Sequence, residues 1–311
     1  MRGSARRALL LALALGACSS PKPVPPDAGP GVSAAPEPST VGLPGCPAYG
    51  EPVKTGVVPR QLPELSGLVA SVRHPGVFWA HNDSGNDFEL FAIDETGKVL
   101  ARLALTGAEP RDIEDVTLGP CAPGVSRVCL FLGDIGDNFA LRDDVRLYRL
   151  PEPETLADAT VPVEVLSFTY PDGAHDAEAL VADARTGRLA LITKTRLSLG
   201  DVYALDGLRP GTVVQATKLG TLSAPENVDR VTTAASLHPS GERLLLRTYS
   251  RVWEVRRAGA GSLEDLLTGT VVQVPHGSQP QGEAITFLSD GQGYLQGTEF
   301  SGQPLWRVGC R

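Results

Sequence analysis

A repeating pattern is the feature that most limits how this chain can fold. Five segments share one register: each begins with a small or acidic residue, continues with apolar residues, and is followed by a turn marked by glycine or proline and then by two further apolar strands. The segments begin at Ser66, Glu114, Glu178, Thr233 and Glu283, which are separated by 48, 64, 55 and 50 positions. A repeat of this length indicates one small supersecondary unit that the chain uses five times.

The strands of each unit predict the architecture. In the first unit the second strand covers residues 77–80, the third 89–93 and the fourth 99–103, whereas the fifth unit ends at Arg311 after its third strand. Four antiparallel strands at a period near 50 are typical of a β-propeller blade. We therefore predict an all-β fold, a β-propeller of five four-stranded blades. Six blades would result if the longer stretch 145–178 contained an additional unit.

The missing outer strand of the fifth unit predicts how the ring closes. The segment around Val53 to Leu62 is a candidate for that strand. Four cysteines of the domain allow three disulfide pairings. Cys121 and Cys129 flank a short turn with proline and glycine and are expected to form a hairpin disulfide, which leaves Cys46 to pair with Cys310 near the two ends of the domain. The chain contains no Cys-x-x-Cys spacing, so the cysteines do not indicate a zinc site.

The first residues indicate export. Three arginines precede the apolar run 8–15, which is too short to span a bilayer, and the small residues Gly16 and Ala17 follow. The stretch 15–18, Leu-Gly-Ala-Cys, resembles the lipobox of bacterial lipoproteins, which implies that Cys18 is acylated and becomes the first residue after cleavage. The alternative is an ordinary signal peptide that happens to contain a cysteine.

These observations divide the chain into three parts. Residues 1–17 are predicted to be a lipoprotein signal peptide, residues 18–45 a lipidated cysteine followed by a disordered Pro/Ala-rich tether, and residues 46–311 the propeller. The lipid bilayer is then the first partner. No aspartate directly follows Cys18, which favours the outer membrane, with the domain facing the periplasm or the cell surface. The excess of 36 acidic over 28 basic residues makes nucleic acid an unfavourable partner.

The repeat also predicts where chemistry is located. In a propeller the innermost strand of each blade begins at the face to which the turn after the second strand returns. Polar residues at these two places are therefore expected to converge around the mouth of the central channel. The predicted ligand-binding funnel consists of Glu64, Asn82, Asp83, Asp112, Glu114, Asp115, Asp134, Asp137, Asn138, His175, Asp176, Glu178, Lys194, Arg247, Glu283 and Glu299.

So many carboxylates in one place would repel one another unless a cation lay among them. A hard divalent ion such as Ca²⁺ accepts six to eight oxygen ligands, and we expect Glu114, Asp134, Glu178 and Glu283 to be its ligands. The alternative is that the inner-strand glutamates hydrogen-bond to backbone amides of the neighbouring blade and hold no ion. The turns 134–138 and 82–85 gather carboxylates and amides around a glycine, although each is also compatible with a plain Asx turn.

Positive charge is expected at the same opening. Lys194, Arg247 and His175, with His81 nearby, could bind a phosphate ester beside a carboxylate-bound cation, or they could simply form ion pairs with the acidic residues. The chain contains no Gly-x-Ser-x-Gly or His-Glu-x-x-His motif of a hydrolytic enzyme. Whether the protein is an enzyme is therefore left open.

Four motifs resemble a group of secreted bacterial propellers. They are residues 64–68, 79–85, 133–138 and 175–180. A more distant similarity is to phytase-like and strictosidine-synthase-like propellers, some of which bind calcium and hydrolyse esters, but the acidic motifs of β-propeller phytases are not fully present. The expected function is that of an envelope lipoprotein whose propeller binds a small-molecule or protein ligand at an acidic funnel, with Ca²⁺ as a structural ion. The alternative is a metal-dependent hydrolase of phosphate or other esters.

Overall fold

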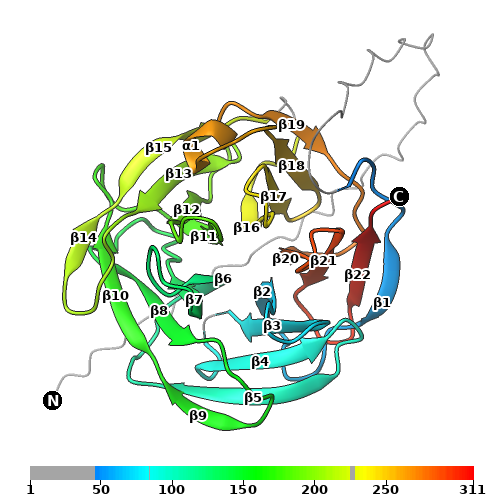
Figure 1. Ribbon diagram of the computed structural model, residues 1–311, viewed down its shortest axis with the longest axis horizontal. Helices are drawn as coiled ribbons and strands as arrows, with labels where there is room; N and C mark the ends of the chain where they lie inside the picture. The colour runs from blue at the N-terminus through cyan, green and yellow to red at the C-terminus, as the bar shows by residue number, and fades with distance from the viewer. Residues whose placement is uncertain (1–45, 84, 225–227) are drawn as a thin grey trace, which may run out of the picture. The chain divides into compact units, whose positions relative to one another are not determined.

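A computed structural model describes residues 46–83, 85–224 and 228–311. This part of the chain forms five β-sheets arranged as a ring, with the first strand of each repeat nearest the centre (Figure 1). The five-bladed propeller predicted from the repeat is confirmed. The inner strands are β2 (Leu65–Ala70), β6 (Ile113–Pro120), β11 (Ala177–Ala182), β16 (Thr232–Leu237) and β20 (Gly282–Phe287).

Each inner strand pairs with the strands that follow it in sequence. Blade 1 adds β3 (Val77–Asn82), β4 (Glu89–Asp94) and β5 (Val99–Thr106), and blade 2 adds β7 (Val128–Asp134), β8 (Val145–Pro151) and β10 (Glu164–Thr169). Blade 3 adds β12 (Leu189–Thr193), β13 (Gly200–Leu205) and β15 (Thr217–Leu222), and blade 4 adds β17 (Arg243–Thr248), β18 (Val252–Arg256) and β19 (Thr270–Gln273). Blade 5 adds β21 (Gly293–Thr298) and β22 (Pro304–Gly309). The described residues contain a single short helix, α1 (Leu263–Leu266), before β19.

The long second repeat has an explanation other than a sixth blade. Its extra residues include β9 (Ala159–Pro162), which pairs in parallel with β5 of the preceding blade, with Leu103 opposite Ala159. In the same way β14 (Val213–Gln215), from the third repeat, pairs in parallel with β10 of blade 2. Two blades therefore each receive a fifth strand from the following repeat, and these exchanges tie neighbouring blades together (Figure 1).

The two ends of the domain close the ring. Strand β1 (Val53–Val57) is antiparallel to β22, with Val53 opposite Arg307, and supplies the missing outer strand of blade 5. The Cys46–Cys310 disulfide lies beside this closure, and Cys121–Cys129 joins the ends of a turn in blade 2. Both predicted disulfides and the predicted closing strand are confirmed.

The apolar core lies between the blades. Each neighbouring pair of sheets encloses its own cluster of buried side chains: Phe131, Leu147 and Leu180 lie between blades 2 and 3, for example, and Ala284 and Leu68 belong to the cluster between blades 5 and 1. These aliphatic and aromatic side chains fill the space between neighbouring sheets at the density typical of protein interiors.

The segment 1–45, which includes the predicted signal peptide, Cys18 and the tether, lies outside the described residues, as does Ser84 in the turn after β3. Within the described ranges no helix is long and apolar enough to cross a membrane.

One irregularity repeats in all five blades and positions the site. The pairing of each inner strand with the second strand of its blade changes register near the start of the inner strand. The residues at the shift are Ser66–Gly67, Glu114, Glu178, Thr233 and Glu283, which are the first residues of the five sequence repeats. A β-bulge removes one residue from the hydrogen-bonded ladder and redirects its side chain. The bulges therefore direct three glutamates from different blades out of the sheets.

Candidate functional site

Acidic side chains from four blades interact at the bulged ends of the inner strands. Two belong to each of blades 2, 3 and 5 and one to blade 1, and Lys194 lies among them. We refer to these residues as the acidic cluster: Asp83, Asp112, Glu114, Asp176, Glu178, Lys194, Glu283 and Glu299. Blade 4 contributes no acid to the cluster, but Tyr249 after β17 lies against Lys194, whose Nζ is 5.5 Å from the ring centroid.

The three bulge glutamates are buried and hold their protons strongly. Burial raises the pKa of Glu114 well above its ordinary value, and repulsion from Glu178, Asp83 and Asp112 raises it further. Burial raises the pKa of Glu178 to about 8. Burial and repulsion from Glu178 raise the pKa of Glu283 to about 9. These three carboxyls therefore cannot all be ionised at neutral pH without additional positive charge.

Lys194 is the cation that the carboxylates share. Its Nζ donates a hydrogen bond to Glu178 Oε1. Burial opposes the charged form of Lys194, but the Glu178 carboxylate outweighs it and raises the lysine pKa above its ordinary value. The same ammonium group also lowers the pKa of Glu114, Glu283 and Glu299 without offsetting their burial and mutual repulsion. One lysine is insufficient to balance the cluster.

Three members of the cluster have the geometry of a metal site. Asp83, Asp112 and Glu114 each offer a carboxylate oxygen, and these oxygens all lie within 4.8 Å of one another. Two oxygens bound to one Ca²⁺ at about 2.4 Å each can be at most about 4.8 Å apart, so the spacing fits this ion. Gly136 makes room for the group, because a Cβ atom there would overlap the carboxylates of Glu114 and Asp112.

This trio differs from the predicted set of metal ligands. Glu114 belongs to both sets, and Glu178 and Glu283 lie in the cluster beside the trio. Asp134 is instead fully buried and engaged by protein groups: the Tyr148 hydroxyl donates to it at 2.6 Å, and Arg142 forms an ion pair with it at 2.9 Å. Its oxygens are therefore committed to the protein. We assign Asp134 a positioning role, since its Oδ1 also accepts the backbone N–H of Asp112 at 3.0 Å.

The turn after β7 is built around Arg142, a residue that the sequence did not single out. The Arg142 Nη1 donates to the Gly136 carbonyl at 2.8 Å, and its backbone N–H donates to the Asp137 carboxylate at 2.7 Å. The backbone N–H of Asp137 donates to Asp176 Oδ1 at 2.8 Å, which joins this turn to blade 3. The neighbouring Asn138 is exposed. The only signal for Arg142 in the sequence is its position next to two aspartates, Asp143 and Asp144.

Asp115 has a structural use. Its carboxylate is fully buried and accepts the backbone N–H of Val116 at 2.8 Å and that of Leu180, on the neighbouring inner strand, at 2.9 Å. The backbone N–H of Ala235, on inner strand β16 of blade 4, lies 3.5 Å from the same carboxylate. Hydrogen bonds to backbone amides of neighbouring blades were the alternative role expected for the inner-strand glutamates. In the structure Asp115 makes these hydrogen bonds. Burial raises its pKa, and the three amides lower it.

The remaining residues of the predicted funnel lie around the cluster. His175 lies beside Asp172, 2.9 Å away, and the Tyr203 hydroxyl. Asn82 ties the turn after β3 by accepting the Glu64 N–H at 3.1 Å, and Glu64 is an exposed acceptor for Asn86. Arg247 is fully buried and donates to Gln279 at 2.9 Å and to Gln296, in blade 5, at 3.2 Å, so it joins two blades.

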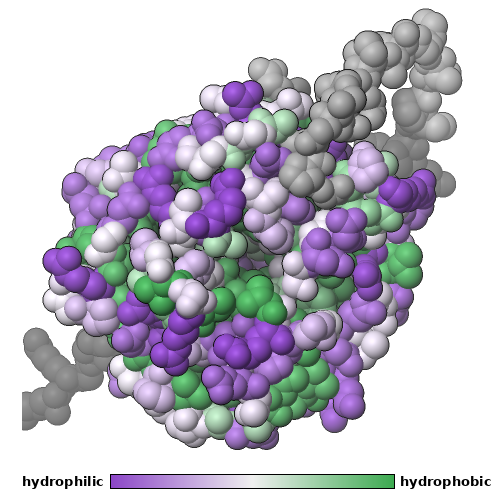
Figure 2. Space-filling model, viewed as in Figure 1, coloured by the Kyte–Doolittle hydropathy of each residue, from purple (hydrophilic) through white to green (hydrophobic). Residues whose placement is uncertain are grey.

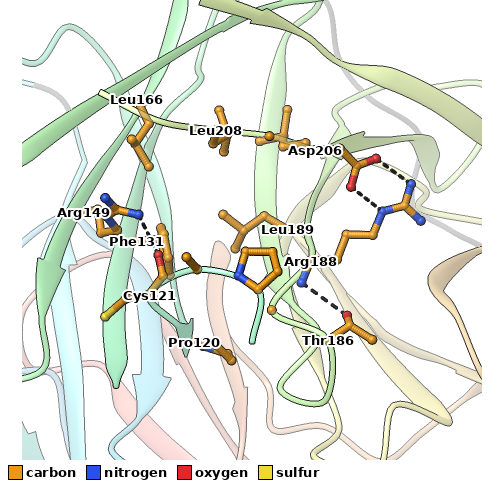
Figure 3. Close-up of a pocket in the computed structure, with 15 residues that line it drawn as sticks. Pro120, Cys121, Phe131, Arg149, Leu166, Thr186, Arg188, Leu189, Asp206 and Leu208 are labelled. Carbon is orange, nitrogen blue, oxygen red and sulfur yellow. Dashed lines mark hydrogen bonds and ion pairs between the residues drawn. The ribbon is translucent and has the colours of Figure 1, made fainter. Parts of the chain in front are cut away.

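Blades 2 and 3 line two cavities, one beside the acidic cluster and one at the opposite end of the strands. A cavity of about 580 Å³ adjoins the cluster, shares Asp176 and Lys194 with it, and extends over Ser198 and Thr221 of blade 3. Another, of about 290 Å³, lies at the other end of these strands, between blades 2 and 3 (Figure 3). Its walls are mainly apolar, and its arginines are already paired: Arg188 with Asp206, and Arg149 with the Cys121 carbonyl. It therefore offers no free charge to a ligand.

No family model matches the chain, and no curated protein sequence matches it. The similarities to the lipobox and to secreted propellers therefore stay expectations from sequence.

Proposed function

We propose that the propeller is an extracytoplasmic binding module that captures positive charge at the acidic cluster, with a divalent cation such as Ca²⁺ held by Asp83, Asp112 and Glu114. The observation that carries the proposal is that carboxylate oxygens of these three residues lie within 4.8 Å of one another, beside two further buried glutamates that share one lysine. A bound cation would supply the missing positive charge, and burial would strengthen its attraction to the carboxylates.

The disulfides support the proposed location. The Cys46–Cys310 and Cys121–Cys129 disulfides are typical of proteins in an oxidising compartment, such as the periplasm or the cell exterior. Acylation of Cys18 would add a lipid anchor, and two acyl chains hold a protein firmly to a bilayer. We therefore propose that the binding module lies at the cell envelope and binds its ligands outside the cytoplasm.

Calcium should stabilise the domain. At a Ca²⁺ concentration about one hundred times the dissociation constant, binding to the folded state adds about 2.7 kcal/mol to the free energy of unfolding. For a domain of this size, that gain raises the melting temperature by about 5 to 10 °C. The measurement is thermal unfolding of the purified domain at pH 7.5 after chelation, followed by Ca²⁺ titration.

The matched variants are Glu114→Gln, which keeps the shape of a proposed ligand, and Glu51→Gln, which alters an acid whose side chain is 84 % exposed. The first should remove most of the calcium effect, and the second should preserve it. A domain whose melting temperature is the same in chelator and in 10 mM Ca²⁺ would refute the metal site.

A second candidate function is metal-dependent ester hydrolysis. It is favoured by the Glu178–Lys194 pair, because burial raises the pKa of Glu178 to about 8, so this carboxyl can release and regain a proton close to neutral pH, as a general acid must. If the protein is such an enzyme, it should hydrolyse p-nitrophenyl phosphate, and chelation should abolish this turnover while the domain stays folded. Glu178→Gln should then lower the rate about 100-fold or more. Turnover that does not exceed the buffer blank excludes this candidate for that ester.

A further inference from the structure

The exposed apolar side chains of the domain are unevenly distributed. Among the described residues, every exposed side chain of leucine or phenylalanine lies in a loop that follows the second strand of a blade. Phe139 (83 % exposed) and Leu141 (78 %) follow β7, Leu197 (84 %) follows β12, and Phe300 (50 %) follows β21. The other exposed large apolar residues in these ranges are valines. Hydrophilic and hydrophobic residues are intermingled over the face viewed in Figure 2.

These loops also carry the acidic cluster. Glu299 directly precedes Phe300, Lys194 lies three residues before Leu197, and Asp137, which binds Asp176, lies two residues before Phe139. The exposed apolar side chains and the buried carboxylates are therefore presented at the same end of the strands. We refer to Phe139, Leu141, Leu197 and Phe300 as the apolar tips.

The backbone of these loops is strained at the same places. The described residues other than glycine with positive φ are Phe300, at 75°, and Ala140, at 51°, next to Phe139. Such a conformation is unfavourable for a bulky residue and persists where the surrounding structure enforces it, which is common at binding sites. Here the backbone N–H of Phe300 donates to the Pro63 carbonyl at 2.7 Å, which helps to hold the loop in this conformation, and the Phe300 side chain is exposed.

A protein partner would gain from covering the tips. Burying the leucine and phenylalanine side chains of the tips against a partner would remove their apolar surface from water, which favours association. A lipid surface is a poorer match, since bacterial membranes are anionic and the cluster is acidic. Charge complementarity instead selects a ligand with a positive group between apolar groups.

We infer that this face binds a protein segment in which a lysine or arginine lies between apolar residues, with the cationic group at Glu283 and Glu299 and the apolar residues against the tips. This inference rests on the proposed function, because it requires that the acidic cluster attract positive charge. It adds to that function the chemical class of the partner. The calcium ligands and the partner's contacts are different residues. Asp83, Asp112 and Glu114 would hold the ion, whereas the carboxylate of Glu283 accepts a hydrogen bond from the Gln281 side-chain amide at 3.1 Å.

The test uses four fluorescent nonapeptides with a central lysine or arginine flanked on both sides by leucines or by phenylalanines. Fluorescence anisotropy with the wild-type domain should show saturable binding of at least one of them. Replacing the central residue of that peptide by glutamate should weaken binding by at least about tenfold. The double variant Phe139→Ser/Leu197→Ser should also bind it about tenfold more weakly, whereas Val125→Ser, in the turn at the other end of blade 2, should bind it like the wild type.

Calcium titration of the same variants separates this inference from the proposed function. If the double variant keeps its calcium affinity but none of the four peptides binds to the wild type below 1 mM, the inference about the partner is overturned and the cation site survives. If the wild type fails to bind calcium, the proposed function is overturned. Sedimentation with vesicles of phosphatidylcholine and phosphatidylglycerol is the remaining arm: vesicle binding that depends on the tips, without peptide binding, would assign them to a membrane and overturn the inference.

Discussion

Removal of the Cys46–Cys310 disulfide should lower the free energy of unfolding by about 4 to 5 kcal/mol, the largest effect expected from any single covalent change in this domain. The bond joins residues separated by 264 positions and secures the blade that contains both ends of the ring. In the chain-entropy model, a cross-link that closes so long a loop removes the most freedom from the unfolded state. The Cys121–Cys129 bond spans only 8 positions and should contribute about 2 to 3 kcal/mol.

The comparison needs two double variants, Cys46→Ser/Cys310→Ser and Cys121→Ser/Cys129→Ser, unfolded in urea alongside the wild type. Because the loop sizes differ and the chemical change is the same, the difference between the variants isolates the contribution of ring closure. Equal losses would mean that the pairing of β1 with β22 closes the propeller without help from the disulfide.

The second large effect is a dependence of stability on pH between 7 and 9 in the metal-free domain. Burial raises the pKa of Glu178 to about 8 and that of Glu283 to about 9, from an ordinary value of 4.5. Between pH 4.5 and 9 the folded state therefore binds more protons than the unfolded state. The stability that these protons provide is complete below pH 4.5 and is lost as the pH rises through 8 and 9.

Each proton changes the free energy of unfolding by about 1.4 kcal/mol per pH unit. Ionisation of Glu178 and Glu283 should therefore lower the free energy of unfolding by about 2 to 4 kcal/mol between pH 7 and pH 9. Measurements should stay above pH 7, because burial lowers the pKa of His81 to about 4, and that histidine has the opposite effect on stability below pH 6.5. Urea unfolding at several pH values gives the slope directly.

Two controls identify the cause of this slope. Glu283→Gln removes one of the titrating groups and should reduce the slope. Saturating Ca²⁺ should flatten it as well, because a neighbouring cation favours the ionised carboxylate. A metal-free domain that is equally stable at pH 7 and pH 9 would show that the glutamates are already ionised and balanced in the folded protein.

Much of the fold could be predicted from the sequence because it depends on local repetition. The alternation of apolar residues and the recurrence of Ser66, Glu114, Glu178, Thr233 and Glu283 at one position of the repeat were sufficient for the five inner strands. The absence of a fourth strand after residues 304–308 then predicted that the N-terminal segment would complete blade 5. Both disulfides followed from the turn between Cys121 and Cys129.

The rest depends on long-range geometry that no local pattern contains. The exchanged strands β9 and β14 are ordinary short strands, and only their packing shows that each belongs to the preceding blade. Convergence at the inner strands was predictable, but the use of each carboxylate was not. Three aspartates of blade 2 have different roles. Asp112 is one of the three residues with the spacing of metal ligands, Asp115 accepts hydrogen bonds from backbone amides, and Asp134 is bound by Tyr148 and Arg142.

The central claim is that carboxylates from different blades come together to hold a cation. Crystals of the domain grown with Ca²⁺ and then soaked in a lanthanide salt would locate the ion by anomalous scattering. We expect a peak in contact with oxygens of Asp83, Asp112 and Glu114, at distances of about 2.3 to 2.6 Å for Ca²⁺. A map with no peak among these three carboxylates, or with ions only on exposed acids elsewhere, would contradict it.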